Sequence, residues 1–254
     1  MRWTALVVYC LAAAGGVQGG GRAQVAARDV RDWDWAVFND FFTEMLHIPS
    51  LGRLVTDVCG QVARAQEAFG GLLGVRARRA DAGCADVTVL FARGTCDPGN
   101  VGVLVGPPFF NALEGRLRAR GRTLGVRGFE YEATVEDFIS RTRAPGRDFI
   151  WTVRATLDEC PHTQLVLSGY SQGCMVVHDA AAFLGPEPMA RVAAAVLFGD
   201  PYAQWPVPNI DPARVSVVCH PEDNVCEGGD IFWGPHLTYS DDADAAAGFV
   251  MAHL

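Results

Sequence analysis

The chain contains no lysine, so each of its 21 basic residues is an arginine. Against them stand 29 aspartate and glutamate residues, and the formal net charge is −8 at pH 7. A nucleic-acid-binding protein needs a basic face to neutralise phosphates. The excess of acid argues against such a partner and favours solubility outside the cell.

Patterns typical of metal sites are also missing. The eight cysteines include no C-x-x-C pair and the six histidines are scattered, so we expect no metal site and no cofactor. Without Cys10, which lies in the leader described next, seven cysteines remain. Seven cysteines allow at most three bridges and leave one thiol free. Cysteine usage on this scale indicates an oxidising compartment.

Long hydrophobic runs are absent apart from one at the N-terminus. Residues 1–27 place Arg2 before an apolar stretch that ends in small residues, which is the pattern of a secretory signal peptide. The run is too short to span a bilayer comfortably. We expect cleavage after Gly19 or Ala27, and therefore a secreted, extracellular protein without a stable membrane anchor. No N-x-S/T sequon occurs, so N-glycosylation is not expected.

Short runs rich in β-branched residues alternate with longer helical stretches from about residue 86 onward. Most of these runs are continuously apolar, as is typical of parallel strands covered on both faces. Stretches such as 147–159 and 172–184 are long enough for crossover helices. The pattern predicts an α/β fold, a three-layer α/β/α sandwich with about five parallel strands. They are expected in 87–93, 123–129, 164–170, 192–200 and 215–221.

Residues 28–80 differ in character and are expected to form a helical N-terminal extension to a catalytic domain over 81–254. The segment "RDWDWAVFNDFFTEMLHI" places aromatic residues on one helical stripe with acids opposite, and a second helical stretch covers about 51–73. Two interpretations stay open. The helices either pack on the sheet as ordinary structure or form a lid over an apolar active site.

A candidate nucleophile lies in "LSGYSQGC", residues 167–174, where Ser171 stands between two glycines. A G-x-S-x-G match alone is weak, but here an expected strand precedes it and an expected helix follows it. That is the setting of a nucleophile elbow, a strained turn with no room for side chains beside the serine. The helix N-terminus would direct its N–H groups at a developing oxyanion. Ser171 could otherwise be only a small residue in a tight turn.

A serine nucleophile needs a base, and the base needs an acid to orient it. His178 falls within an expected helix and His253 in the C-terminal tail, which favours structural roles for both. His236 lies in a loop rich in glycine and proline before the last expected helix. The chain order of α/β-hydrolases places the base in that loop. We therefore prefer His236 to His220.

The acid is chosen among three carboxylates. Asp223 lies in "CHPEDNVC", between two cysteines seven positions apart, and a bridge closing so short a loop would hold the carboxylate in place. Asp200 ends the run "VLFGD", where it could equally cap a turn. Glu222 is the weaker alternative. We prefer Asp223.

Four motifs in this order resemble the cutinase family, small secreted serine esterases that include acetylxylan-esterase-like relatives. The motifs are "CADVTVLFARGTCDPGNVG", "CPHTQLVLSGYSQG", "CHPEDNVCEGG" and "PHLTY". The resemblance covers about residues 84–254, two thirds of the chain. In its N-terminal extension the chain resembles the lid-bearing members among fungal cutinases.

This resemblance implies an α/β-hydrolase fold with a triad of Ser171, Asp223 and His236. It also implies an oxyanion hole built from the backbone N–H of Gln172 and from the backbone N–H and hydroxyl of Thr95. Disulfides implied by the resemblance are Cys84–Cys160 and Cys219–Cys226. We take Cys59–Cys96 as a third bridge that leaves Cys174 as a buried free thiol, while a Cys59–Cys174 bond stays open.

From these features we expect a monomeric serine esterase that hydrolyses cutin-type polyesters and short-to-medium acyl esters through an acyl-enzyme on Ser171. Two roles are open for Val225, Phe232 and Leu237. They either form the apolar walls of an acyl-chain site or belong to the ordinary packing of the fold. One alternative function is deacetylation of polysaccharide by an acetylxylan-esterase-type enzyme. Another is a catalytically silent secreted surface protein of the same fold.

Overall fold

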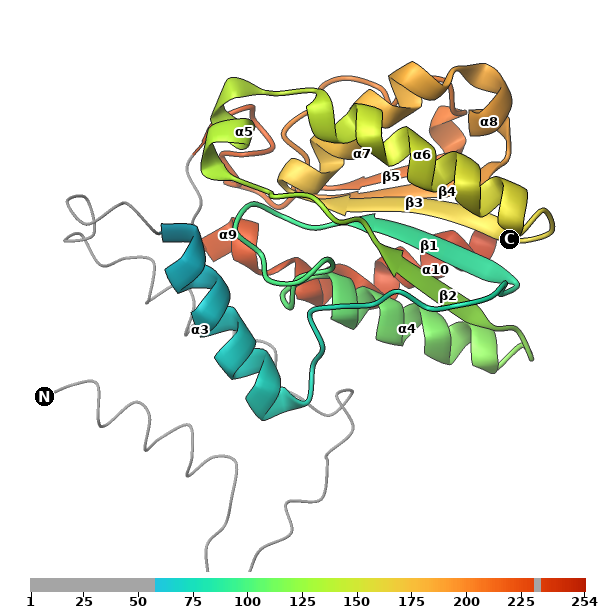
Figure 1. Ribbon diagram of the computed structural model, residues 1–254, viewed down its shortest axis with the longest axis horizontal. Coiled ribbons are helices and arrows are strands. Elements are labelled where there is room, and N and C mark those ends of the chain that lie inside the picture. The colour runs from blue at the N-terminus through green and yellow to red at the C-terminus, as the bar shows by residue number, and fades with distance from the viewer. Residues whose placement is uncertain (1–57, 231–233) are drawn as a thin grey trace, which may run out of the picture.

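Five parallel strands form a single sheet in the order β2-β1-β3-β4-β5 (Figure 1). The computed structural model describes residues 58–230 and 234–254. Each strand lies within its expected range, so the prediction of about five parallel strands is confirmed. The strands are β1 (Val87–Ala92), β2 (Leu124–Gly128), β3 (Gln164–Tyr170), β4 (Val192–Phe198) and β5 (Val215–Val218).

Helices cover both faces of the sheet and complete the three expected layers (Figure 1). On one face α6 (Ala144–Glu159) packs against α7 (Gln172–Leu184), and on the other α4 (Gly106–Arg118) packs against α10 (Ala243–Ala252). The inner strand β1 is buried along its whole length, which explains its mostly apolar sequence. Shorter elements are α5 (Val135–Ser140), α8 (Pro186–Ala190), η3 (Pro212–Arg214), α9 (Gly234–Leu237) and η4 (Tyr239–Asp242).

Each face of the sheet has its own hydrophobic core. Phe91 lies in the core shared with α4 and α10, while its neighbour Leu90 lies in the core shared with α6 and α7. Successive side chains of a strand point to opposite faces, so β1 contributes to both cores. A fully buried leucine or phenylalanine stabilises a fold by roughly 1.5–3 kcal/mol. The two cores fix the sheet, and with it the loops that leave the strand ends.

The carboxyl ends of the strands meet at one edge because all five strands are parallel. Thr95 follows β1, Ser171 follows β3, Asp200 follows β4 and Asp223 follows β5. Open parallel sheets bind ligands outside this edge. The topology therefore brings the candidate residues from distant parts of the sequence to one place.

The N-terminal extension is described from Val58 onward. Helix α3 (Val58–Leu73) lies within the helical stretch expected over 51–73. The expected signal peptide over 1–27 and the aromatic stripe of the first extension helix lie outside the described residues. Within the described ranges, no helix is long and apolar enough to cross a membrane.

Three disulfides are present in the structure, and they join the pairs expected from the sequence. One of them, Cys59–Cys96, ties α3 to the loop after β1, so Cys59 does not pair with Cys174. Cys174 is a buried free thiol on α7. The other two bonds are Cys84–Cys160 and Cys219–Cys226.

Candidate active site

Ser171 occupies the turn between β3 and α7. Its backbone has φ of 53° and ψ of −120°, a conformation that residues other than glycine rarely adopt. The N–H of Ser171 donates to the carbonyl of Phe198 on the neighbouring strand at 2.8 Å, which helps to hold the turn. A strained serine between a buried strand and a helix is the arrangement of a nucleophile elbow.

The flanking glycines are required by close backbone contacts. A Cβ on Gly173 would lie 1.9 Å from the carbonyl oxygen of Ala92 on β1. A Cβ on Gly169 would lie 2.5 Å from the carbonyl of Gly173. Any larger residue at either position would push α7 away from the sheet. The G-x-S-x-G spacing is therefore explained by packing around the serine.

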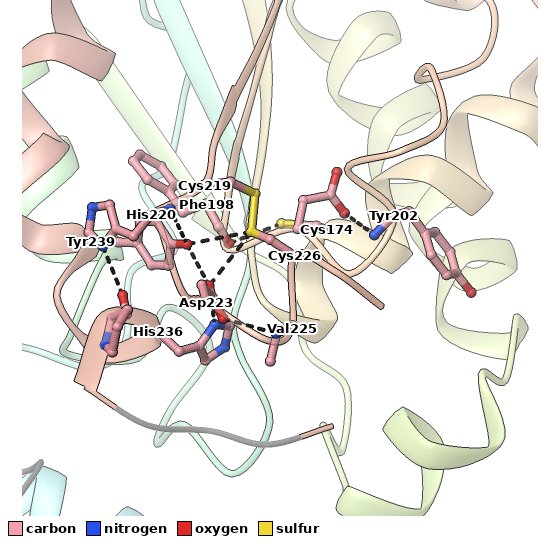
Figure 2. The surroundings of a disulfide bond; sticks show 12 residues. Cys174, Phe198, Tyr202, Cys219, His220, Asp223, Val225, Cys226, His236 and Tyr239 are labelled. Atoms are coloured by element: carbon pink, nitrogen blue, oxygen red, sulfur yellow. Dashed lines mark hydrogen bonds and ion pairs between the residues drawn. A yellow bond between two sulfur atoms is a disulfide. The ribbon is translucent and has the colours of Figure 1, made fainter. Parts of the chain in front are cut away.

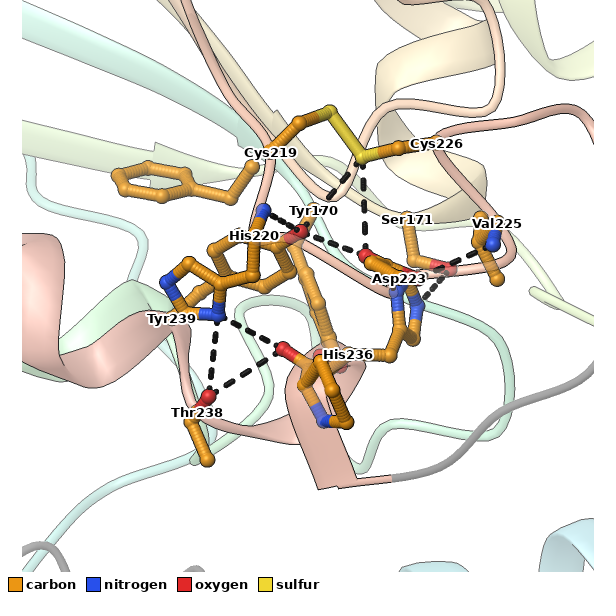
Figure 3. Close-up of polar contacts among 12 residues, drawn as sticks. Tyr170, Ser171, Cys219, His220, Asp223, Val225, Cys226, His236, Thr238 and Tyr239 are labelled. Carbon is orange, nitrogen blue, oxygen red and sulfur yellow. Dashed lines mark hydrogen bonds and ion pairs between the residues drawn. A yellow bond between two sulfur atoms is a disulfide. The ribbon is translucent and has the colours of Figure 1, made fainter.

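Two hydrogen bonds connect Ser171 to Asp223 through His236 (Figure 3). The Oγ of Ser171 lies 2.9 Å from Nε2 of His236, and Nδ1 of His236 lies 2.8 Å from Oδ2 of Asp223. A carboxylate only accepts, so Nδ1 carries the proton and Nε2 is left to accept from the serine hydroxyl. The structure thus brings together the three residues that the sequence singled out as nucleophile, base and acid.

All three side chains are almost fully buried. Ser171 is 2% exposed and His236 and Asp223 are each 1% exposed. Hydrogen bonds and charge interactions are stronger in such a site than in water. A hydroxyl, an imidazole and a carboxylate in this order can transfer a proton from Ser171 to His236 and stabilise the resulting imidazolium.

His236 is placed by short helix α9 and by its neighbours on the sheet. The hydroxyl of Tyr170 donates to the backbone carbonyl of His236 at 2.8 Å, and the two rings stack at 5.3 Å. Gly199, at the end of β4, has φ of +58°, and a Cβ there would lie 2.8 Å from Cε1 of the His236 ring. Neither Tyr170 nor Gly199 could be assigned a role from the sequence, because their contacts with His236 form only in the folded protein.

Asp223 lies in the loop closed by the Cys219–Cys226 bond (Figure 2). The N–H of Val225 donates to Oδ1 at 3.0 Å and the hydroxyl of Tyr239 donates to Oδ2 at 2.5 Å. Burial raises the pKa of Asp223, but hydrogen bonds from His236 and Tyr239 and the charge of His236 outweigh it. The net result is a pKa below the ordinary value. Asp223 therefore stays negative at neutral pH.

The rejected candidates have other partners. Asp200 accepts from Nε2 of His178 at 2.8 Å and from the backbone N–H of Tyr202, so it forms a buried pair with a histidine of α7. His220 bonds Asp242 through Nε2 at 2.6 Å. Glu222 is exposed at the surface of the loop.

The residues expected to form an oxyanion hole lie beside Ser171. Gln172 is the first residue of α7, where backbone N–H groups have no carbonyl partner within the helix. The hydroxyl of Thr95 donates to Oε1 of Gln172 at 2.9 Å, so the loop after β1 is held against the helix N-terminus. The adjoining Cys96 has φ of 61° and its N–H donates to the carbonyl of Ala133.

The residues expected to wall an acyl chain do not all lie in similar surroundings. Val225 is fully buried in a small apolar cluster with Phe138 and Met175, next to Asp223. Leu237 belongs to the core between the sheet and the α4–α10 layer. This matches the second of its two expected roles, ordinary packing. Phe232 lies outside the described residues.

Comparison with known proteins places this geometry in a family. The family model described as cutinase matches residues 83–254. A cutinase of Trichoderma harzianum is 51% identical over 217 residues, which are 85% of this chain and 86% of the relative.

Solved structures agree with the sequence matches. The structure of Trichoderma reesei cutinase in complex with a phosphonate inhibitor superposes with a TM-score of 0.76 at 49% identity, covering 86% of this chain and 98% of that one. The catalytic core domain of acetyl xylan esterase from Trichoderma reesei has a TM-score of 0.52 at 19% identity, covering 68% of this chain and 100% of that one. This second likeness shows the shared fold alone. The expected resemblance is thus confirmed, and the chain belongs to the cutinase family of carboxylic ester hydrolases.

Proposed function

We propose that the chain is a secreted serine esterase that acts on cutin-type polyester and related acyl esters. Ser171 is the nucleophile, His236 the general base and Asp223 the acid that orients it. The observation that carries this proposal is the hydrogen-bonded path Ser171–His236–Asp223, at 2.9 and 2.8 Å, on a strained strand-to-helix turn. Relatives about half identical to the chain, which carry the name cutinase, support the substrate class.

Acylation begins when Nε2 of His236 takes the proton of Ser171. The Oγ then attacks the ester carbonyl carbon, and the carbonyl electrons move onto its oxygen to give a tetrahedral oxyanion. When this intermediate collapses, His236 gives its proton to the leaving alcohol and the acyl group stays on Ser171. The negative charge of Asp223 stabilises the imidazolium throughout and takes up no proton.

Deacylation repeats these steps with water as the nucleophile. His236 removes a proton from water, hydroxide attacks the acyl-enzyme carbonyl, and His236 returns the proton to Oγ of Ser171 as the acid product leaves. The same imidazole thus serves both halves of the reaction, and no group beyond the triad and the oxyanion donors is needed.

The oxyanion is stabilised by Thr95 and Gln172. The N–H of Gln172 is at the positive end of α7, and Thr95 supplies its N–H and its hydroxyl. In this structure the hydroxyl donates to the Gln172 side chain, so it must rotate away from Gln172 to donate to the substrate oxygen. Loss of one such donor costs roughly 3 kcal/mol of transition-state stabilisation.

An apolar acyl chain suits the surroundings of the triad. Met175 lies one helical turn after Ser171, and Val225 lies two residues after Asp223, and both pack with Phe138. This cluster favours polyester substrates over acetylated sugars, which present polar surface. The lid interpretation of the N-terminal extension predicts a site that opens when the protein meets an ester surface.

The test is hydrolysis of p-nitrophenyl esters from acetate to palmitate, with and without mild detergent, and with Ser171→Ala as the control. We expect an optimum near butyrate, higher rates in detergent, and no activity in the variant. An optimum confined to acetate would shift the assignment to polysaccharide deacetylation. No activity on any ester would contradict an esterase.

The protein is proposed to act as a monomer, which light scattering coupled to gel filtration checks.

A further inference from the structure

Tyr239 is in direct contact with Asp223, the acid of the triad. It begins η4, three residues after His236, and it is 0% exposed. Figures 2 and 3 show its ring between His220 and Asp223, and in Figure 3 it lies on the side of Asp223 away from Ser171. A fully buried hydroxyl needs partners, because an unpaired one would destabilise the fold.

The hydrogen bonds of Tyr239 fix the direction of its single proton. The backbone N–H of His220 donates to the Tyr239 oxygen at 3.0 Å, so that oxygen acts as an acceptor toward His220. Its own O–H then donates to Oδ2 of Asp223 at 2.5 Å. This is the oxygen that also accepts from Nδ1 of His236. Tyr239 and His236 therefore hold the same carboxylate oxygen.

The ring of Tyr239 is itself held in place. His220 stacks on it with a centroid separation of 4.2 Å. The His220 ring is in turn fixed by Asp242 at 2.6 Å and by the carbonyl of Pro235 at 2.8 Å. Because His220 is held by residues before and after Tyr239 in the sequence, the ring of Tyr239 is fixed and its hydroxyl has little freedom to leave Asp223.

We propose that Tyr239 is a positioning residue for the ester hydrolysis, acting through Asp223. The N–H of Val225 holds Oδ1 and Tyr239 holds Oδ2, so the carboxylate cannot rotate away from Nδ1 of His236. Tyr239 also shares the negative charge of Oδ2, which sets how strongly Asp223 stabilises the imidazolium. This inference rests on the proposed function.

Removal of the hydroxyl has a predictable effect on the pH profile. Without its donor, Asp223 protonates at higher pH, and its less dispersed charge holds the proton of His236 more tightly. Both changes move the acid limb of kcat/KM to higher pH, by roughly half to one unit.

Other titratable groups face this site from several elements. Asp97, in the loop after β1, interacts with His236, and burial raises its pKa to about 6. The thiol of Cys174 on α7 interacts with Tyr239 and Asp223, and burial holds its pKa well above the ordinary value. His220 follows β5, and Tyr170 ends β3. Tyr239→Phe leaves all of these groups in place, so the difference between its pH profile and that of the wild type reports the Asp223–His236 pair.

The experiment compares Tyr239→Phe with Tyr170→Phe, which removes another buried hydroxyl that bonds the backbone of His236. For Tyr239→Phe we expect kcat/KM on p-nitrophenyl butyrate to fall about tenfold, as for loss of a hydrogen bond to a charged group, with the acid limb moved to higher pH. Tyr170→Phe is expected to leave the limb in place. In the background of Asp223→Asn, Tyr239→Phe is expected to change kcat/KM less than twofold.

Three results would overturn the assignment: an unchanged acid limb, an equal shift in both phenylalanine variants, or a tenfold loss that persists in the Asp223→Asn background. Should Tyr239→Phe fail to fold, 3-fluorotyrosine at position 239 keeps the shape and is a stronger donor. It must then move the limb to lower pH, and no movement would equally overturn the role. A wild type without Ser171-dependent hydrolysis overturns the proposed function itself and this role with it. An active wild type with an unaffected Tyr239→Phe overturns this role alone.

Discussion

Gly199 leaves the space in which the His236 ring lies. Its φ of +58° already disfavours a side chain, and a Cβ would lie 2.8 Å from His236 Cε1 and 2.7 Å from the Tyr239 ring. Because the His236 ring is also stacked against Tyr170, it has little room to move away. A single methyl group at position 199 should therefore displace the base from Ser171.

We predict that Gly199→Ala lowers kcat/KM on p-nitrophenyl butyrate by about 100-fold, the effect of misplacing a reacting group by about 1 Å. The free energy of unfolding should fall by about 1–3 kcal/mol. Gly185→Ala is the control, because Gly185 has φ of +77° but no atoms within 4 Å of the added Cβ. It should lose stability without losing activity per folded molecule. Equal activity in the two variants would contradict the role of Gly199.

Asp97 is a buried carboxyl beside the oxyanion loop. It accepts from the N–H of Gly94 at 3.0 Å and from the side chain of Gln66 on α3. Burial raises its pKa to about 6 from an ordinary value of 3.8, and these hydrogen bonds only partly oppose the effect. Between these values the unfolded chain loses a proton that the folded chain keeps, so stability falls as pH rises through this window.

We predict that Asp97→Asn removes this fall, because an asparagine oxygen still accepts from Gly94 and carries no charge. The gain in unfolding free energy over wild type should be larger at pH 7 than at pH 4, by up to about 3 kcal/mol for a shift of about two pH units. Urea unfolding across this range measures it. A difference between the two proteins that does not vary with pH would refute the titration of Asp97 in this window.

Helix α3 and the loop after β1 are joined twice. The Cys59–Cys96 bond connects them covalently, next to Thr95, and the Gln66–Asp97 hydrogen bond connects them two turns further along the helix. The first described residues of the extension are therefore linked to the loop that holds a proposed oxyanion donor. An element outside the sheet contributes in this way to the geometry of the site.

We predict that Cys59→Ser with Cys96→Ser lowers kcat several-fold as well as stability, by about 4 kcal/mol from chain entropy for a 37-residue separation. The matched control is Cys84→Ser with Cys160→Ser, whose bond closes 76 residues near the opposite edge of the sheet. It should destabilise the fold by about 4–5 kcal/mol while kcat per folded molecule stays constant. If both double variants keep the wild-type kcat, α3 does not support Thr95.

Across the whole molecule, local patterns predicted the elements better than the contacts between them. The strands were recognisable because β1, β3 and β4 are covered on both faces and so are mostly apolar. Ser171 was recognisable because its turn requires glycines at fixed spacing. The preference for His236 came from chain order, and the preference for Asp223 came from its place in the short loop between Cys219 and Cys226. Both agree with the bonds observed in the site.

Other features could not be read from local patterns. These features are the contacts of Tyr239 with Asp223, of Gly199 with His236 and of Gln66 with Asp97. Each joins residues that are separated in the sequence, so each depends on tertiary packing. Leu237 shows the converse, since an apolar residue beside the base packs in the core. The sequence pattern indicates which residues can take part in the reaction, whereas the residues that position them are identified only from the fold.

The most direct test of the account is covalent labelling of Ser171. An alkyl phosphonate p-nitrophenyl ester carries a tetrahedral phosphorus that a serine nucleophile attacks, with p-nitrophenol leaving. Intact mass spectrometry of the treated protein should show one phosphonyl group per chain, peptide mapping should place it on Ser171, and Ser171→Ala should remain unlabelled. An unlabelled wild type in the presence of detergent, or a label on another residue, would contradict Ser171 as the nucleophile.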